Sequence, residues 1–294
     1  MHFRQSRTFF AWFAALALFA LSACEGVSPT PLLPSQTPQP PTQTPLPMAI
    51  TINGGGITAA EFEEELARFQ AAQTSLGYSV SLDEATRQVL DDLTNLVLLE
   101  QGAQEAGFIV DDAMLSARID GLAAQIGGMQ ALADWEEQHG YTDASLRQSL
   151  RRQMAAAWMR DQIIASVPST AEQVHVQQIL LYNLDKAQAV LEQLNSGADF
   201  ASLATEIDPV TRGELGWFPR GYLPDIQVEE AAFTLQPGQY STIVETRAGF
   251  SILLVLERET GHILSPDASL ALQALALENW LKDKRMQSNI QLAP

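Results

Sequence analysis

The most informative part of this chain reads Gly213-Glu214-Leu215-Gly216-Trp217-Phe218-Pro219-Arg220-Gly221, followed by Glu229-Glu230-Ala231-Ala232-Phe233-Thr234-Leu235-Gln236-Pro237-Gly238. Short predicted elements surround it. Runs of apolar and β-branched residues predict strands over 174–181, 241–245 and 250–257, and helical periodicity predicts helices over 186–195 and 200–206. The order of strand, helices, strand and strand within about 85 residues indicates a small antiparallel sheet with helices on one side.

The two quoted stretches resemble the central signature of the parvulin-type (PpiC, or rotamase) peptidyl-prolyl cis-trans isomerases, small domains that rotate the bond before proline in other polypeptides. The family's opening strand reads His-Ile-Leu where this chain has Gln178-Ile179-Leu180, and its closing strand reads Gly-Tyr-His-Ile where this chain has Gly249-Phe250-Ser251-Ile252. The resemblance therefore places Gln178 and Ser251 at the family's two histidine positions. These side chains are able to hydrogen-bond each other across a sheet. His175 is a poor replacement, because an offset of three along a strand puts it on the opposite face.

The same resemblance implies further site residues. Its acid position falls on Asp208, a candidate catalytic group, although an aspartate before Pro209 is also a common start of a turn. Its apolar pocket for the proline ring is shallower here, because valine replaces a phenylalanine. The pocket positions are Leu215, Leu223 and Val228, with Phe233 beneath them, and all are also candidates for the core.

Rotation about a prolyl bond needs no covalent step. The partial double bond of the amide sets a barrier of roughly 18–20 kcal/mol, and a catalyst lowers it by holding the proline in an apolar, poorly solvated place where the twisted amide is favoured. Binding and desolvation do not require the family's histidines. We therefore expect a peptidyl-prolyl isomerase with weakened activity. The alternative is a non-catalytic holdase or assembly chaperone that uses this domain to dock peptides.

Helices are predicted before and after this domain. The run Ala49-Ile50-Thr51-Ile52 alternates like a short strand, Asn53-Gly54-Gly55-Gly56 predicts a turn, and Thr58 and Glu61 have capping-box spacing. Apolar periodicity then predicts helices over 83–106, 111–126, 131–138 and 142–167, and a last helix over 267–286. We expect the last helix to pack back on the others, because its apolar stripe otherwise has nothing to cover.

The helical block resembles the N-terminal chaperone domain of SurA- and PrsA-like foldases. The points of resemblance are Ile52-Asn53-Gly54 before Ile57-Thr58, Leu98-Leu99-Glu100, Ala106-Gly107-Phe108-Ile109-Val110 and Gly140-Tyr141-Thr142. This resemblance implies that the partners are unfolded or proline-containing secreted polypeptides. The expected fold class is α+β, with an all-helical chaperone domain, a small antiparallel-sheet parvulin domain and a C-terminal helix that packs back on the helical domain.

The beginning of the chain is typical of a secretory signal peptide, with basic residues before an apolar run over 9–21. The run ends in Leu21-Ser22-Ala23-Cys24, which resembles a bacterial lipobox and implies lipidation of Cys24, the only cysteine. An ordinary signal peptide is the alternative. Eight prolines between Pro29 and Pro47 predict an extended tether. We therefore expect an extracytoplasmic protein anchored by lipid to the bacterial cell membrane.

The chain has 17 basic and 35 acidic side chains, a formal net charge of −18. This balance argues against nucleic acid as a partner. No group of histidine, cysteine or aspartate has the spacing of a metal site, and no phosphate loop is present, so we expect no metal and no cofactor. The predicted organisation is a signal peptide (1–23), a lipidated cysteine and tether (24–48), a helical chaperone domain (49–170), a parvulin-like domain (171–260) and a C-terminal helix (261–294).

Overall fold

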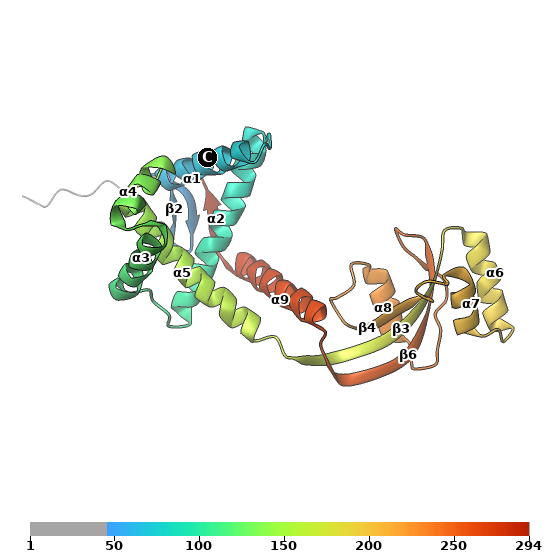
Figure 1. The fold of residues 1–294 in the computed structure, drawn as a ribbon. Coiled ribbons are helices and arrows are strands. Elements are labelled where there is room, and N and C mark those ends of the chain that lie inside the picture. The colour runs from blue at the N-terminus through green and yellow to red at the C-terminus, as the bar shows by residue number, and fades with distance from the viewer. Residues whose placement is uncertain (1–45, 294) are drawn as a thin grey trace, which may run out of the picture. The chain divides into compact units, whose positions relative to one another are not determined.

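The computed structural model describes residues 46–293, which form helices and small antiparallel sheets (Figure 1). The predicted signal peptide, the predicted lipidation site Cys24 and the predicted tether up to residue 45 lie outside the described residues. Among residues 46–293, no helix is long and apolar enough to cross a membrane.

The first part of the described chain is a β-hairpin followed by helices. Strands β1 (Met48–Ile52) and β2 (Gly55–Thr58) pair antiparallel across the predicted turn. The predicted capping box is present, because the Glu61 amide donates to the Thr58 hydroxyl and the Thr58 amide donates to the Glu61 carboxylate. The helices are α1 (Ala59–Ser75), α2 (Leu82–Glu105), α3 (Asp112–Ile126), α4 (Met129–Gln138) and α5 (Asp143–Ala165).

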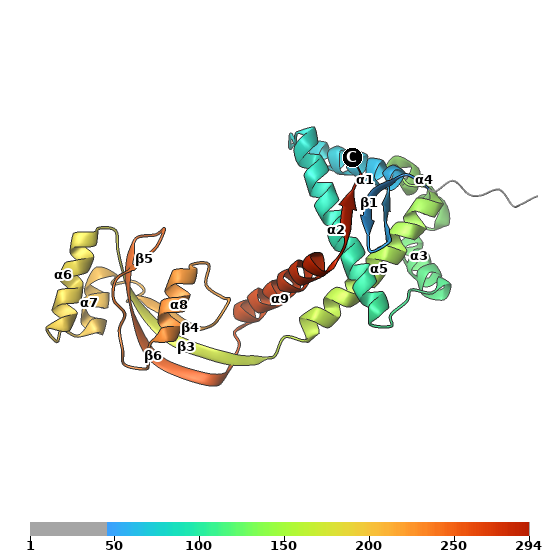
Figure 2. The same ribbon diagram turned by 180° about the vertical axis from the view of Figure 1, so that it is seen from behind.

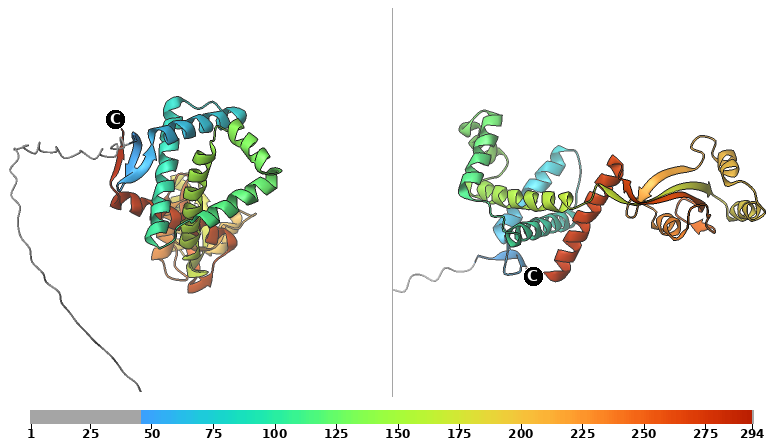
Figure 3. Two further views of the ribbon diagram at one scale, coloured as in Figure 1. Left: turned by 90° about the vertical axis from the view of Figure 1, so that its left-hand side faces the viewer. Right: turned by 90° about the horizontal axis from the view of Figure 1, so that it is seen from below.

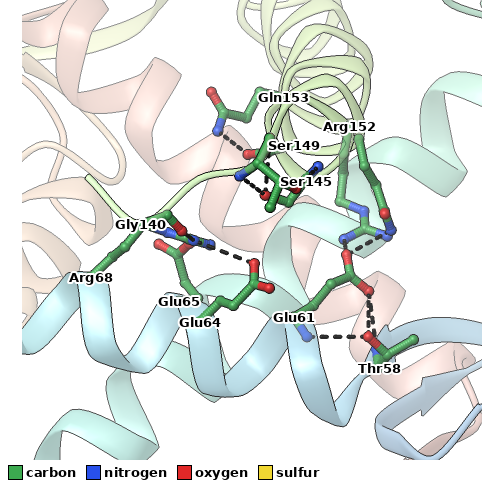
Figure 4. A network of polar contacts seen from close by, with 12 residues as sticks. Thr58, Glu61, Glu64, Glu65, Arg68, Gly140, Ser145, Ser149, Arg152 and Gln153 are labelled. Atoms are coloured by element: carbon green, nitrogen blue, oxygen red, sulfur yellow. Dashed lines mark hydrogen bonds and ion pairs between the residues drawn. The ribbon is translucent and has the colours of Figure 1, made fainter. Parts of the chain in front are cut away.

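Two arginines tie α1 to its neighbours (Figure 4). Arg152 on α5 is only 11% exposed; its Nη1 lies 3.0 Å from a Glu61 oxygen and its Nε 2.9 Å from a Glu100 oxygen. Arg68 on α1 donates to the Gly140 carbonyl at 3.1 Å. Because these charges are largely removed from water, the arrangement of α1, α2 and α5 depends on keeping the ion pairs together.

The C-terminal segment completes this helical part, as the sequence predicts. Helix α9 (Pro266–Gln287) contacts α2, where Trp280 packs on Gly102 and the Arg285 guanidinium donates to the Asn95 side chain at 2.8 Å. The chain then forms β7 (Ile290–Leu292), which pairs with β1 and extends the hairpin to the order β2-β1-β7 (Figure 3). Strand β7 was not predicted, because its three residues carry no periodicity of their own.

A second sheet has the strand order β4-β3-β6-β5, with every neighbouring pair antiparallel. The two central strands, β3 and β6, are the longest and contribute side chains to both faces of the sheet. The strands are β3 (Thr170–Leu181), β4 (Glu214–Pro219), β5 (Val244–Glu245) and β6 (Phe250–Ile263), and the helices are α6 (Leu184–Asn195), α7 (Phe200–Ile207) and α8 (Ile226–Thr234).

Helices cover both faces of this sheet, so the expectation of helices on one side was wrong (Figure 1, Figure 2). Ile179 and Leu181 of β3 pack with α6 and α7. Val174 and Val176 pack with α8. Because side chains alternate along a strand, these two pairs point to opposite faces. The error has a simple cause: α8, which overlaps the second signature stretch, was not predicted as a helix.

Candidate functional site

Gln178 and Ser251 meet on the face of the sheet that α8 covers. The Gln178 Nε2 donates to the Ser251 Oγ at 2.7 Å, as expected from their positions in the sequence. The register Gln178↔Leu253 and Leu180↔Ser251 makes them diagonal neighbours. Ser251 is fully buried, whereas Gln178 is partly exposed. Ser251 is therefore the buried member of the pair, and the side-chain amide of Gln178 is the accessible one.

Asp208 follows α7 and begins a tight loop. Its Oδ1 accepts from the amides of Val210 at 3.0 Å and Thr211 at 3.1 Å, and its Oδ2 accepts from the Thr211 hydroxyl. The hydroxyl bond, followed by the Thr211 amide bond, lowers the pKa of Asp208 below its ordinary value. Asp208 is thus ionised at neutral pH, and its loop already uses both carboxylate oxygens.

The end of this loop is fastened to Gln178. The Gln178 amide donates to the Gly213 carbonyl at 2.7 Å. Gly213 has φ +68°, and a Cβ on it would lie 1.9 Å from the Gln178 carbonyl oxygen. Only glycine fits this contact. The pairing of β3 with β4 shifts register between Val176 and Gln177, which indicates a bulge at Leu215.

The four predicted pocket residues lie in one apolar cluster between α8 and the sheet. Val228 and Phe233 are each 5% exposed, so they belong to its packed core, and Leu215 and Leu223 are only partly buried. The Phe233 ring meets the ring of Phe218 edge-on, with centroids 6.1 Å apart. Among the four predicted pocket residues, the accessible apolar surface is therefore that of the two leucines.

Glu229 positions one of these leucines, and sequence analysis did not single it out. Its buried carboxylate accepts from the amides of Gly221 at 2.8 Å, Tyr222 at 3.1 Å and Leu223 at 3.2 Å. A carboxylate with three amide donors is a rigid support for a loop. The signature contains Glu229 beside Glu230, but the sequence alone does not say which of them is buried.

Two clefts open beside these residues. One of about 480 Å³ is lined by Gln178, Asp208 and Leu215, together with Ile179, Leu180, Leu181, Tyr182, Asn183, Lys186, Ala204, Ile207, Thr211, Gly213 and Glu214. The other, of about 680 Å³, lies at the start of α8 and is lined by residues 224–227 and 245–248. The structure thus brings three predicted site residues, Gln178, Asp208 and Leu215, to the first cleft. Ser251, Val228 and Phe233 are buried, and neither they nor Leu223 line this cleft.

His175 takes no part in this cleft. Its Nε2 lies 2.6 Å from a Glu214 oxygen, and its ring stacks on Trp217 with centroids 5.3 Å apart. The His175 ring therefore makes these contacts with β4 rather than with Gln178 or Ser251. Among the described residues, no group of three histidine, cysteine, aspartate or glutamate side chains is placed to hold a metal ion.

Comparison with known proteins identifies the class that this fold defines. The profile of the PPIC-type PPIase domain matches residues 163–257. The profile of the SurA-like N-terminal domain matches residues 3–160, more than half of the chain. The chain therefore belongs to the SurA-like family of proteins that join this N-terminal domain to a PPIC-type domain.

Individual proteins are similar to this chain over parts of its length. The chaperone SurA of Alcanivorax borkumensis is 26% identical over 253 residues, which cover 71% of this chain and 56% of that protein. The foldase protein PrsA of Halalkalibacterium halodurans is 36% identical over 95 residues, which cover 31% of this chain and 28% of that protein. PrsA from Bacillus cereus, in its crystal structure, is 21% identical in sequence and has a TM-score of 0.45. The match covers 79% of this chain and 84% of that chain. The chain spans about half the length of the SurA relatives it matches.

Proposed function

We propose that this chain is an extracytoplasmic, membrane-tethered folding factor that binds proline-containing segments of unfolded secreted or envelope proteins and speeds rotation about their Xaa-Pro bonds. The observation that carries the proposal is the hydrogen-bonded pair of Gln178, which lines the cleft, and the buried Ser251. Although neither residue is a histidine, the two keep a direct hydrogen bond between the central strands, 73 residues apart in sequence.

The geometry supports catalysis by binding and desolvation. Leu215 brings apolar surface to the same cleft as Gln178. In the twisted amide the nitrogen loses its conjugation and becomes a hydrogen-bond acceptor. The Gln178 Nε2 donates one hydrogen to Ser251. In this proposal its second hydrogen is donated to the prolyl nitrogen of the bound peptide. Asp208 has a positioning role, because its oxygens hold the loop that borders the cleft.

The lipid anchor is part of the proposal. It is supported by the lipobox-like run that ends at Cys24 and by the proline-rich residues up to 47. The lipid would anchor the chain, and the proline-rich segment would hold the folded part at a distance from the bilayer. Mass spectrometry of the membrane fraction tests it. We expect diacylglycerol on Cys24 and release of the Cys24→Ser variant from the membrane. Retention of that variant would contradict the anchor.

The test of isomerisation uses the mature full chain and NMR exchange spectroscopy on short Xaa-Pro peptides. We expect faster cis-trans exchange than in buffer, a loss of about tenfold in Gln178→Ala, and a smaller loss in Asp208→Asn than in Asp208→Ala, since asparagine keeps an acceptor for the loop amides. Equal losses in the two Asp208 variants would contradict the positioning role.

A second candidate function is peptide docking without catalysis, as in a holdase. The burial of Val228, which leaves only a shallow apolar surface, favours it. Peptide binding at the cleft with no faster exchange would select this candidate. Both candidates require that the full chain slow the aggregation of a denatured client at stoichiometric concentration, and failure of that assay would remove the chaperone role.

A further inference from the structure

Strand β3 has one open edge inside the 480 Å³ cleft. It pairs with β6 over its length up to Leu181, but its pairing with β4 ends at Gln177, and the Gln178 amide makes the last bond on that side. Leu180, Leu181 and Tyr182 follow within the lining of the cleft. Among the described residues, the end of β3 therefore has no neighbouring strand on the β4 side.

The direction of the Leu180 backbone follows from the hydrogen bonds around it. Successive residues of a strand point their amide and carbonyl groups to opposite sides. The Gln178 amide points to the β4 side, where it bonds to Gly213. Leu180, two residues on, points the same way, whereas Ile179 and Leu181 point to β6. No described residue hydrogen-bonds to the backbone of Leu180, so its amide and carbonyl face the cleft as an unused donor and acceptor.

We propose that a client polypeptide binds as an added β-strand along this edge, with its main chain hydrogen-bonded to the Leu180 amide and carbonyl. The inference rests on the proposed function and names how the substrate is held. An extended peptide fits because strand addition at a free edge supplies main-chain bonds that do not depend on sequence. The client residue that donates to the Leu180 carbonyl must not be proline, which has no amide hydrogen.

The side chains near the edge define the chemistry of this client. Tyr182 is 82% exposed at the cleft, and Val210, in the loop that borders it, is 88% exposed. They favour aromatic or aliphatic client residues beside the proline. The cleft carries Asp208 and Glu214 against Lys186, on a chain of net charge −18. The client is therefore an extended, apolar segment with basic flanks. Bound along Leu180, it lies in the cleft that Gln178 also lines.

Amide hydrogen exchange measured by NMR tests the strand pairing directly in the mature full chain. The probe is a ten-residue peptide with lysines at both ends and a central Tyr-Pro. Saturating peptide is expected to slow exchange of the Leu180 amide at least tenfold and leave the Leu181 amide, already bonded toward β6, unchanged. Peptide binding or catalysis without protection of Leu180 overturns the inference and leaves the proposed function intact. Protection of Leu180 without peptide, rising with protein concentration, would assign the edge to a second copy of this chain and also overturns it.

An independent test changes the backbone of the peptide and leaves the protein unaltered. Each amide is replaced in turn by an ester, which removes one donor. We expect binding to weaken about fivefold at one position or at positions two apart, and to change little elsewhere. Uniform effects along the peptide contradict an added strand.

Two variants of one residue separate backbone from side chain. Leu180→Pro removes the amide donor at an edge position where proline is tolerated, and Leu180→Ala keeps the donor. Binding is expected to fall about fivefold more in the proline variant than in the alanine variant. Equal binding by two folded variants overturns the inference. If the proline variant does not fold, the ester scan decides.

Finally, peptides in which glutamates replace the terminal lysines are expected to bind at least threefold more weakly at low salt, with the difference shrinking as salt is added. Equal affinity would contradict the basic flanks.

Discussion

The Gly213 α-carbon lies so close to the Gln178 carbonyl that a β-carbon there would be 1.9 Å from its oxygen. The Gln178 amide in turn bonds to the Gly213 carbonyl. This contact ends the pairing of β3 with β4 and holds the Asp208 loop beside the cleft. One glycine thus sets both the position of the loop and the point at which the edge of β3 becomes free.

Replacement of this glycine should be far more costly than replacement of Gly216 in the strand β4 that follows it. Gly213→Ala combines left-handed backbone with a clash against main chain and is expected to lower the free energy of unfolding by about 3 kcal/mol. Gly216 has φ +73° but open space around it, so Gly216→Ala is expected to lose only about 1 kcal/mol. Urea unfolding of the full chain measures both values, and equal losses would show that the contact is unimportant.

The Gln178–Ser251 bond should be measurable as a coupling. Gln178→Ala leaves the buried Ser251 hydroxyl without this donor and is expected to cost about 1–2 kcal/mol of stability. A double-mutant cycle with Ser251→Ala should give an interaction energy of about 1 kcal/mol. Gln188→Ala, on the exposed surface of α6, is the control and should change stability by less than about 0.5 kcal/mol. Additive single effects would contradict the coupling.

Asp208 should titrate at a lower pH than an ordinary aspartate. Because folding depresses its pKa, the stabilisation it provides is present above the unfolded value of about 3.9 and is lost as the pH falls through the depressed folded value. NMR titration of its carboxyl carbon should show this. Thr211→Val should raise the pKa of Asp208 toward the ordinary value, whereas Thr205→Val, on α7, should leave it unchanged. An unaltered pKa in the Thr211 variant would mean that the hydroxyl bond is not its cause.

Two neighbouring arginines on α5 should differ sharply in their contribution to stability. Arg152→Met leaves Glu61 and Glu100 facing each other without their cation and is expected to cost about 3 kcal/mol. Arg151 pairs with Asp112 at the surface, so Arg151→Met should cost less than about 1 kcal/mol. Chemical unfolding compares the two variants, and similar losses would show that the buried network in Figure 4 does not fix α1.

Elements with strong local signals were predictable from sequence. The helices from α2 to α5 and α9 follow from apolar periodicity, and the Thr58 capping box, which begins α1, follows from spacing alone. The positions of Gln178 and Ser251 came from a resemblance, and the opposite face of His175 from the two-residue period of a strand. Prediction succeeded where the deciding interactions lie within one helical turn or one strand.

Other features depended on partners far away in the chain. Strand β7 exists because β1 offers an edge to it, and α8 covers a face of the sheet that local periodicity did not reveal. The free edge at Leu180 is defined by where the pairing of β3 with β4 ends. The side-chain pattern along one segment determines which of its faces is apolar. Strand pairing and burial depend on contacts with remote segments, because only folding brings those segments together.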